Sequence, residues 1–456
     1  MRKILIIGAG RSSSSLIKYL LDTSSKENLH ITIGDVSVES AQAKINNHPN
    51  ATAIQLDVFN TEQRVEAIQN ADIVISMLPA HYHMEVAKDC VAYSKHMVTA
   101  SYISKDMQAL DEAVKEKGLV FMNEIGLDPG IDHMSAMQVI DRIKEEGGEM
   151  LLFESFCGGL VAPESDTNLW NYKFTWNPRN VVLAGQGGAA MFRQENTYKY
   201  IPYHKLFRRT EFLDIEGHGK FEAYANRDSL KYTSVYGLDT IPTMYRGTIR
   251  KVGFSRAWNA FVQLGMTDDT YTIEDSENMS YRDFTNLFLA YSPSDSVELK
   301  FRSYLKIDQD DIMWDKFLEL DLFNPNKKVG LQNATPAQIL QQILSDKWTL
   351  EANDKDMIVM HHKFGFENQS GKHQIESSMV INGDDQTYTA MAKTVGLPVA
   401  MATVRILNGE INTPGVQLPI TKEVYEPILK ELEEYGITFS EKEVPYLGYN
   451  PESVKG

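Results

Sequence analysis

Cysteine is scarce in this sequence, which has only Cys90 and Cys157 among its 456 residues. Two cysteines cannot form a disulfide framework, and so low a count is typical of proteins in a reducing compartment. The sequence also lacks a run of about 20 apolar residues, the length of a membrane-spanning helix. The apolar run at 4–7 stops at Gly8 and is too short for a signal peptide. We therefore expect a cytoplasmic protein that does not bind membranes.

Positive charge is also in short supply, since 45 lysines and arginines are outnumbered by 62 aspartates and glutamates. The formal net charge of -17 argues against nucleic acid and against an anionic membrane surface as partners. A small anionic substrate stays possible, because a local group of arginines can override the field of the whole protein. The length predicts two or three domains, because single hydrophobic cores stop growing at about 300 residues.

The histidines do not predict a metal site. His81 and His83 form one short pair, and His361 and His362 form another. Neither pair has an acidic residue or a cysteine at the spacing that metal ligands need. We therefore expect these histidines to be exposed to solvent or to cap helices, and we expect no bound metal.

The first part of the chain alternates short apolar runs with amphipathic stretches, and short loops join them. This alternation is typical of a doubly wound parallel sheet, so we predict an α/β fold of the Rossmann type. Strands are expected at 3–8, 29–34, 52–56, 72–78, 96–100 and 119–122, and helices at 12–22, 37–47, 61–69, 84–92 and 107–117.

The alternation ends near residue 134, and a second kind of organisation follows. A polar, helical stretch at 280–350 predicts a small helical insert. Two runs at 356–366 and 374–381 alternate apolar and polar residues, as the strands of a hairpin do. The remaining predictions are a helix at 134–146, a strand at 151–157, a helix at 387–407 with a kink or break at 396–398, and a last helix at 424–434.

A glycine-rich turn follows the first predicted strand, with Gly8, Gly10 and Ser13 in the pattern G-x-G-x-x-S. Two glycines allow a tight turn and a close approach of the backbone to a pyrophosphate, and the next helix offers free N–H groups. The third position needs a small residue, which serine satisfies. The pattern predicts a dinucleotide site, and the alternative is a tight turn without a nucleotide.

Asp35 comes directly after the second predicted strand, about 25 residues after the glycines. A carboxylate there can accept hydrogen bonds from the adenosine ribose and repels a 2′-phosphate, so it favours NAD over NADP. The alternative role is to cap the helix at 37–47. Asp57, after the third predicted strand, is expected near the adenine.

The segment 123–133, NEIGLDPGIDH, combines turn signals with acidic residues just after a strand-like run. Proline and glycine after Asp128 predict a tight turn at the edge where α/β enzymes place their ligands. Ser101 and Tyr102 close the strand before it and are expected at the same edge. Tyr102 could contact the nicotinamide or a substrate carboxylate, or it could simply be a packed aromatic residue.

Three arginines, at 227, 246 and 250, are the candidates for anion binding. The planar guanidinium group binds carboxylates in a bidentate manner. Residues 245–250, YRGTIR, read as a strand, so Arg246 and Arg250 would share one face of it. The alternative is that all three are ordinary surface arginines.

Taken together, these motifs resemble the saccharopine dehydrogenase family of the glutamate-forming type, which also forms the C-terminal part of aminoadipic semialdehyde synthase. The resemblance runs along nearly the whole chain. It is carried by GAGRSS, DIVISMLPAHYH, MVTASYIS, NEIGLDPGIDH, FCGGLVAPE, YKFTWNP, YANRDS, YRGTIR, KDMIVMHHKFGF and YTAMAKTVGLPVAMATVRILNGEI. The chain departs from the family mainly in the loop after Cys157 and at 185–205, which are expected to influence substrate choice.

The resemblance implies three domains and a homodimer. Residues 1–127 with 390–456 would form a Rossmann domain that binds NAD or NADP. An inserted α/β domain for substrate binding and dimerisation would comprise 128–280 with 351–389, and a small helical domain would comprise 281–350.

The resemblance also implies a reaction. A hydride leaves the ε-carbon of saccharopine for the nicotinamide, and the resulting imine is hydrolysed to glutamate and 2-aminoadipate 6-semialdehyde, or the reverse condensation takes place. Tyr102 and Asp128 are the candidates for proton transfer, although either could merely orient the substrate while water or a substrate carboxylate moves the proton. Carried over by position, cofactor contacts fall on Gly8, Gly10, Arg11, Ser12, Ser13, Asp35, Asp57, Val58, Leu78, Ser101, Leu127, Asp128 and Thr175, and substrate contacts on Ser101, Tyr102, Asp128, Arg227, Arg246, Thr248, Ile249 and Arg250.

Two other functions stay open. One is a related carboxyalkyl-amine dehydrogenase, such as one acting on carboxynorspermidine. The other is a protein that binds the nucleotide as a sensor without catalysis. The spacing of the three arginines favours a substrate with several carboxylates, which argues against the first. The presence of Tyr102, Asp128 and the arginines argues against the second.

Overall fold

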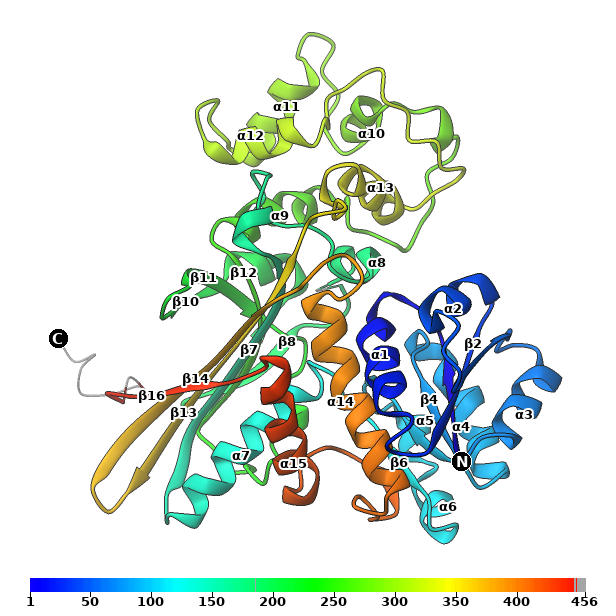
Figure 1. Cartoon of the computed structure of the whole chain (residues 1–456). Helices are drawn as coiled ribbons and strands as arrows, with labels where there is room; N and C mark the ends of the chain where they lie inside the picture. Colours follow the sequence, from blue (N-terminus) through cyan, green and yellow to red (C-terminus); the bar gives the residue numbers. More distant parts are fainter. Residues whose placement is uncertain (185, 447, 449–456) are drawn as a thin grey trace. The chain divides into compact units, whose positions relative to one another are not determined.

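The computed structural model describes residues 1–184, 186–446 and 448. Backbone contacts divide the chain into two compact units, Met1–Glu149 with Met379–Ser440, and Met150–Ser378 with Glu441–Gly456 (Figure 1). Each unit is described by itself below. The predicted three-domain division stays a prediction, and its far end, at residues 447 and 449–456, lies outside the described residues.

The first unit contains a seven-stranded sheet in the order β15-β6-β5-β4-β1-β2-β3. Every neighbouring pair in it is parallel. Without β15, this is the strand order of a dinucleotide-binding Rossmann fold, so the predicted fold class is confirmed. The seventh strand, β15, comes from the C-terminal part of the chain and was not expected. The strands are β1 (Arg2–Ile7), β2 (Leu29–Asp35), β3 (Ala51–Gln55), β4 (Ile73–Ser76), β5 (His96–Val98), β6 (Val120–Met122) and β15 (Gly415–Gln417).

Helices follow the strands of this sheet, and α2, α3, α5 and α14 begin at side-chain caps. The Ser37 hydroxyl accepts a hydrogen bond from the N–H of Ser40 at the start of α2, and Asn60 caps α3 in the same way. These caps satisfy N–H groups that a helix start leaves without partners. The helices of the first unit are α1 (Ser14–Thr23), α2 (Val38–Ile45), α3 (Thr61–Gln69), α4 (His83–Ala92), α5 (Lys105–Gln108), α6 (Asp111–Glu116), α7 (Ile131–Glu145), α14 (Ala390–Leu407) and α15 (Lys422–Leu432).

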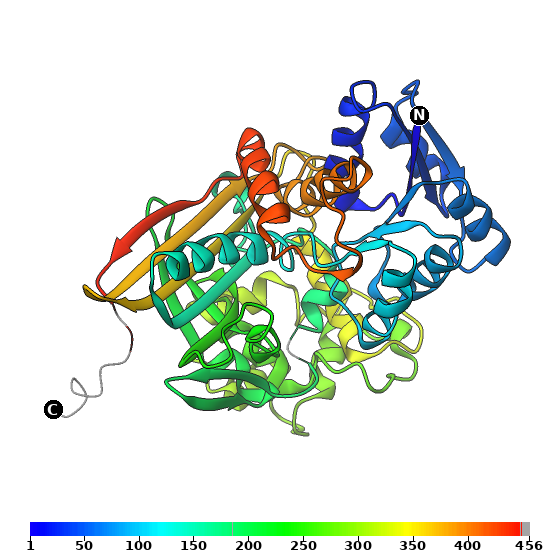
Figure 2. The ribbon, with the colours of Figure 1, turned by 90° about the horizontal axis from the view of Figure 1, so that it is seen from below.

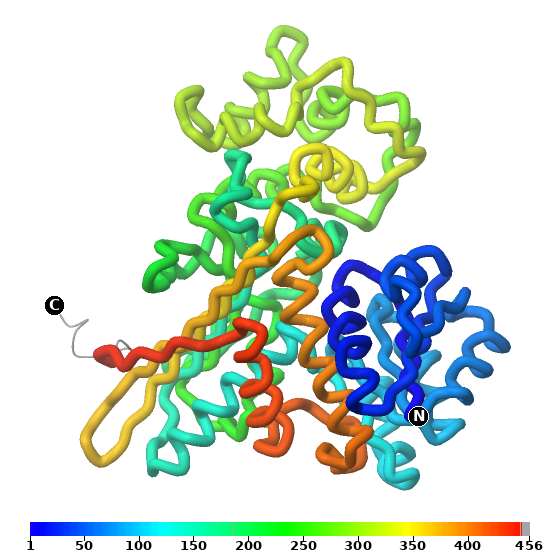
Figure 3. Tube along the Cα trace, viewed as in Figure 1, coloured from blue at the N-terminus to red at the C-terminus, as the bar shows by residue number. Residues whose placement is uncertain are grey.

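The C-terminal helix α14 packs along α1, and α15 packs against α7, although each pair is far apart in sequence (Figure 3). The approach is close at Gly396, where an added Cβ would lie 2.9 Å from the backbone nitrogen of Leu16. By length and composition alone α14 could cross a membrane, but 78% of it is buried inside the protein. It therefore acts as a core helix of this unit.

A kink or a break was predicted at 396–398. A break does not occur, since α14 runs without interruption through Pro398, and the kink stays a prediction. An interior proline costs a helix about 3 kcal/mol. The neighbouring side chains Leu397, Val399 and Met401 are fully buried, at 2%, 0% and 0% exposure. Burial of each such side chain contributes about 1.5–3 kcal/mol, so packing outweighs the local preference.

The second unit is built on a nine-stranded sheet, whose main path is β10-β11-β12-β7-β13-β14-β16 and whose β8 and β9 lie off that path. The predicted hairpin is confirmed as β13 and β14, and Figure 2 shows the red strand β16 lying along it. The strands are β7 (Glu149–Val161), β8 (Ala190–Gln194), β9 (Thr197–Ile201), β10 (Thr210–Ile215), β11 (Gly219–Ala225), β12 (Thr243–Lys251), β13 (Asp356–Asn368), β14 (Gly371–Asn382) and β16 (Ser440–Val444).

The region 281–350 is helical, as expected, and belongs to the second unit. Trp170 lies beneath it, with its ring stacked on Phe261 and edge-on to Phe317 and Trp348. This aromatic cluster forms the local core. The helices of the second unit are α8 (Pro178–Val182), α9 (Phe254–Leu264), α10 (Tyr281–Leu287), α11 (Val297–Leu305), α12 (Ile312–Glu319) and α13 (Pro336–Trp348).

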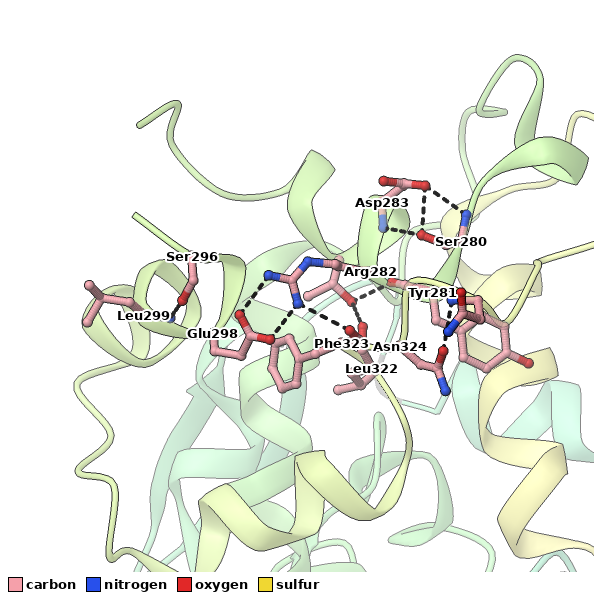
Figure 4. Close-up of polar contacts among 12 residues, drawn as sticks. Ser280, Tyr281, Arg282, Asp283, Ser296, Glu298, Leu299, Leu322, Phe323 and Asn324 are labelled. Atoms are coloured by element: carbon pink, nitrogen blue, oxygen red, sulfur yellow. Dashed lines mark hydrogen bonds and ion pairs between the residues drawn. The ribbon is translucent and has the colours of Figure 1, made fainter. Parts of the chain in front are cut away.

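A polar network joins α10 to α11 (Figure 4). The Arg282 guanidinium binds both carboxylate oxygens of Glu298, with one N–O distance of 2.9 Å, and donates to the carbonyl of Phe323 at 3.2 Å. Ser280 and Asp283 form a capping box at the start of α10. A bidentate ion pair restricts the relative orientation of its two side chains, so this network orients the two helices.

Candidate active site

The glycine-rich turn has the geometry that a pyrophosphate site requires. Gly8 has φ of +106°, and an added Cβ would lie 3.0 Å from the carbonyl oxygen of Met77, so only glycine fits there. An added Cβ at Gly10 would meet no atom within 4 Å, which leaves open space in front of the first turn of α1. Ser13 is 1% exposed and donates a hydrogen bond to the carbonyl of Gly10 at 2.8 Å. Serine therefore replaces the third glycine without disturbing the turn.

Asp35, at the end of β2, faces this turn. Its Oδ2 accepts a hydrogen bond from the N–H of Ala9 at 2.7 Å, and its Oδ1 accepts one from the N–H of Ser37 at 3.0 Å. Ser37, not Asp35, is the residue that caps α2. The carboxylate is thus held at the glycine turn, where a nucleotide ribose would lie in a Rossmann fold.

The other predicted contacts of the first unit follow the carboxyl ends of the remaining strands. Because the strands are parallel, these ends share one edge of the sheet, and β1 and β4 are the neighbours at which the strand order reverses. The structure therefore brings these residues to one edge: Gly8, Gly10, Arg11, Ser12 and Ser13 after β1, Asp35 at the end of β2, Asp57 and Val58 after β3, Leu78 after β4, Ser101 and Tyr102 after β5, and Leu127 and Asp128 after β6.

The two predicted catalytic residues are in direct contact. The Tyr102 hydroxyl donates a hydrogen bond to Asp128 Oδ1 at 3.0 Å. Asp128 lies in a tight turn that Gly130 completes, since Gly130 has φ of +146° and an added Cβ would lie 2.1 Å from the carbonyl oxygen of Gly126. The turn thus fixes where the carboxylate points.

Glu124 supports this pair and was not anticipated as a site residue. It is fully buried, and its Oε1 accepts a hydrogen bond from the N–H of Ile103 at 2.8 Å. Its Oε2 lies 3.0 Å from Nε2 of His133, on α7. Glu124 therefore ties the loop that carries Tyr102 to the helix that follows the Asp128 turn. Its one sequence signal was its place in the acidic segment at 123–133.

The expectation for the histidines was wrong for three of the four. His83, His361 and His362 are 4%, 2% and 0% exposed, and only His81 is exposed. His83 lies between two serine hydroxyls, with Nδ1 2.8 Å from Ser76 Oγ and Nε2 2.7 Å from Ser101 Oγ. A buried imidazole with both nitrogens paired escapes the cost of an unsatisfied polar group, which explains why burial is tolerated.

In the second unit, β12 carries the candidate anion-binding residues. Side chains alternate along a strand, so Arg246, Thr248 and Arg250 share one face and Ile249 points to the other. The reading of 245–250 as a strand is confirmed. Only the backbone of Ile249 can therefore face a ligand on that side.

Arg250 is a buried cation in an aromatic box. It is 4% exposed, and its guanidinium carbon lies 5.1 Å from the ring centre of Tyr172 and 5.4 Å from that of Phe254. One amino group donates to the carbonyl of Ile249, but Nε has no hydrogen-bond partner among the described residues. Thr175, predicted as a cofactor contact, belongs to this second unit, and its buried Oγ1 also lacks a partner in the part of the chain that the structure describes. Glu222 stands opposite Arg250 on β11, but its two oxygens accept hydrogen bonds from the N–H groups of Gly253 and Ser255. A buried donor without an acceptor is costly, so the Nε of Arg250 fits an anionic ligand.

The other two arginines lie on neighbouring pieces of the same unit. Arg246 is 3% exposed, with its guanidinium carbon 4.5 Å from the ring centre of Tyr232. Arg227, in the loop after β11, is exposed and donates to the carbonyl of Leu183 at 3.3 Å. Asn226 joins the two segments, because its N–H donates to the carbonyl of Arg246 and its side chain accepts from Thr248.

Comparison with protein families agrees with this arrangement of parts. The model described as the saccharopine dehydrogenase NADP binding domain matches residues 4–122. The model described as the saccharopine dehydrogenase C-terminal domain matches residues 126–437. The chain belongs to the saccharopine dehydrogenase family. The resemblance noted from the motifs is thereby confirmed.

Individual members of the family match along the whole chain. The saccharopine dehydrogenase (NADP(+), L-glutamate-forming) of Schizosaccharomyces pombe is 33% identical over 97% of this chain and 99% of its own length. The mitochondrial alpha-aminoadipic semialdehyde synthase of Rattus norvegicus is 33% identical over 96% of this chain but 47% of its own, so the chain spans about half the length of that relative. Apo saccharopine dehydrogenase (L-Glu forming) from Saccharomyces cerevisiae superimposes with a TM-score of 0.88 at 32% identity, covering 97% of this chain and 100% of that one.

Proposed function

We propose that this chain catalyses the nicotinamide-dependent cleavage of saccharopine to glutamate and 2-aminoadipate 6-semialdehyde, or the reverse reductive condensation, in lysine metabolism. Family membership and the names of the relatives support the reaction class. The observation that carries the proposal is the buried Arg250, whose Nε lacks a partner among the described residues. A substrate with three carboxylates supplies the counter-charge that this group needs.

Substrate recognition rests on the second unit. Arg250, whose guanidinium carbon lies 5.1 Å from the ring centre of Tyr172, would bind one carboxylate. Arg227 and Arg246 would bind a second, since Asn226 links the segments that carry them. Guanidinium groups suit this task because they bind carboxylates through two parallel hydrogen bonds.

Proton transfer rests on the first unit. A bound nicotinamide would accept a hydride from the ε-carbon of saccharopine, and loss of the proton from the secondary amine would leave an imine. Water then adds to the imine carbon, and the carbon–nitrogen bond breaks to release glutamate and the semialdehyde. Tyr102 and Asp128 are hydrogen-bonded to each other, so either can pass a proton to or from the reacting nitrogen or the water.

The dinucleotide would occupy the edge of the first sheet. The open space at Gly10, the N–H groups of the first turn of α1 and the fixed carboxylate of Asp35 fit a pyrophosphate and a ribose. The family's domain is an NADP binding domain, and the S. pombe relative is named for NADP(+). We propose that NAD is nevertheless preferred here, because the Asp35 carboxylate would repel a 2′-phosphate.

A substrate panel tests the proposal. Initial rates are followed by the absorbance of the reduced nicotinamide with saccharopine or carboxynorspermidine, each with NAD and NADP. Turnover of saccharopine at least tenfold faster than that of carboxynorspermidine is expected. Faster turnover of carboxynorspermidine than of saccharopine would assign the chain to the related amine dehydrogenases. Dinucleotide binding without turnover of either amine would make it a sensor.

Two further properties belong to the same proposal. The chain would act in the cytoplasm, for which the low cysteine count is the support. It would act as a homodimer, which light scattering of the purified protein tests directly.

A further inference from the structure

Three buried or half-buried side chains form a line at the carboxyl edge of the first sheet. Ser76 is the last residue of β4, His83 is the first residue of α4, and Ser101 follows β5. The imidazole bridges the two hydroxyls, at 2.8 Å from Ser76 Oγ and 2.7 Å from Ser101 Oγ. Ser76 is 0% and His83 is 4% exposed, whereas Ser101 is half-buried.

The line has a direction, because a neutral imidazole has one donor nitrogen and one acceptor nitrogen. The His83 imidazole is neutral at physiological pH, since burial and the nearby His81 lower its pKa to about 4. In the forward direction, the Ser76 hydroxyl donates to Nδ1 and the protonated Nε2 donates to the Ser101 hydroxyl oxygen. In the reverse direction, the Ser101 hydroxyl donates to Nε2 and the protonated Nδ1 donates to the Ser76 hydroxyl oxygen.

The surroundings of Ser76 decide between the two directions. Its hydroxyl has no hydrogen-bond partner other than His83 among the described residues, and it is fully buried. In the reverse direction the Ser76 proton would be left without an acceptor, which is unfavourable in the interior. In the forward direction the Ser76 proton goes to Nδ1 and the Nε2 proton goes to Ser101 Oγ. The Ser101 proton is then available to a ligand.

We propose that His83 is a positioning residue that turns the Ser101 hydroxyl into a hydrogen-bond donor for the ligand, with Ser76 setting the imidazole tautomer. Ser101 then presents its proton to an acceptor oxygen. Two acceptors have the same chemistry, the carboxamide oxygen of the nicotinamide and a carboxylate of the substrate. This inference deepens the proposed function and rests on it only for the identity of the acceptor.

The tautomer itself is tested first, because that measurement needs no substrate. Long-range nitrogen–proton correlation on protein labelled at histidine, with His83→Gln used to assign the signals, identifies the protonated nitrogen of His83. Protonation at Nε2 is expected. Protonation at Nδ1 would overturn the proposal, since Ser101 would then donate to the ring and not to a ligand.

Variants test whether the line acts on ligand binding. Ser76 contacts neither substrate nor cofactor in the proposed site, yet Ser76→Ala is expected to weaken the ligand of Ser101 by about threefold to tenfold, since the tautomer is no longer set. His83→Leu is expected to lose at least tenfold, and His83→Gln to recover most of it, because the glutamine amide can donate to Ser101 Oγ. Ser24→Ala, another buried serine in the same unit, is the matched control for folding.

A double-mutant cycle separates positioning from a structural role. His83→Leu is expected to have no further effect in a Ser101→Ala background, because the hydroxyl that it positions is already gone. A weaker dinucleotide Kd identifies the carboxamide as the acceptor, and a higher KM for saccharopine at unchanged Kd identifies the carboxylate. Additive effects, or unchanged constants in folded variants, would overturn the proposal.

Failure of the proposed function gives a different pattern. A wild-type protein that does not turn over saccharopine, but shows the Nε2-protonated ring and a dinucleotide affinity that depends on His83, would retain this inference and lose the reaction.

Discussion

The hydroxyl oxygen of Tyr102 lies 3.0 Å from Oδ1 of Asp128, although the two residues belong to loops after different strands. A phenol bound to a carboxylate can pass a proton in either direction. The fully buried Glu124 accepts a hydrogen bond from the N–H of Ile103, next to Tyr102, and so helps to fix this contact. Tyr102 is 49% exposed, so a substrate can reach its hydroxyl while Glu124 holds the loop that places it beside Asp128.

If Tyr102 and Asp128 transfer the proton to or from the reacting nitrogen or the water, removing either residue will slow catalysis. Tyr102→Phe and Asp128→Asn are each expected to lower kcat by about 10²-fold, within the range for general acid–base groups. The double variant is expected to be little worse than the more damaged single one, because the two act together. Steady-state kinetics over pH provide the measurement, with Tyr93→Phe as the control. A normal kcat in either single variant would assign that residue to substrate orientation alone.

Cofactor choice depends on the charge of Asp35. Asp35→Asn keeps an oxygen that can accept from the Ala9 N–H but removes the negative charge. The variant is expected to gain at least tenfold in its preference for NADP relative to NAD, because repulsion of the 2′-phosphate is lost. The ratio of kcat/KM for NADP to that for NAD measures this preference, and Asp22→Asn, which removes an exposed carboxylate on α1 that pairs with Lys18, serves as the control. A wild-type protein that already prefers NADP would contradict the role given to Asp35.

Acid stability depends on the buried histidines. Burial lowers the pKa of His361 to about 3, below the value of about 6.5 expected in the unfolded chain. The unfolded state therefore binds more protons between these values, so this residue makes stability fall as pH drops from about 6.5, by on the order of 1 kcal/mol per pH unit.

The comparison of variants isolates that contribution. His361→Gln is expected to show a shallower loss of unfolding free energy between pH 6.5 and pH 4 than the wild type, measured by urea denaturation. Glu154, whose pKa burial raises, changes stability in the opposite direction but is the same in both proteins. His218→Gln removes an exposed histidine and is expected to leave the slope unchanged. Equal slopes in all three proteins would contradict the assignment.

Local pattern was sufficient for the Rossmann sheet, the glycine turn and the place of Asp35. Each of these follows from residues close together in sequence, with strand periodicity and turn chemistry as the signals. The strand β15 was missed because its three residues carry no period, and it forms only by pairing with β6, almost 300 residues earlier. Such pairing is determined by tertiary structure and cannot be predicted from a short stretch of sequence.

The burial of individual polar side chains could not be predicted from the sequence either. His83 has no flanking signal, and its burial depends on hydroxyls from two other segments. The box around Arg250 is likewise assembled from Tyr172, Tyr224 and Phe254, which come from separate elements. The arginine itself was predicted as a ligand contact. That Nε of this buried guanidinium lacks a partner among the described residues became visible only in three dimensions.

Arg250 carries the central claim, that a buried guanidinium whose Nε lacks a partner among the described residues binds a carboxylate of saccharopine. Loss of a charged hydrogen-bonding partner typically costs about 1.5–3 kcal/mol, or roughly 10- to 150-fold in binding. Arg227→Ala, which changes an exposed arginine of the same proposed site, is expected to raise KM as well. Arg256→Ala changes an exposed arginine that pairs with Asp311 and serves as the control.

The most direct measurement is the affinity of saccharopine for the wild type and for Arg250→Ala, determined by titration calorimetry in the presence of the dinucleotide. We predict a Kd at least tenfold weaker in the variant, with unchanged affinity for the dinucleotide alone. Equal saccharopine affinity in the two folded proteins, or an equal loss of affinity for saccharopine and dinucleotide, would contradict the account.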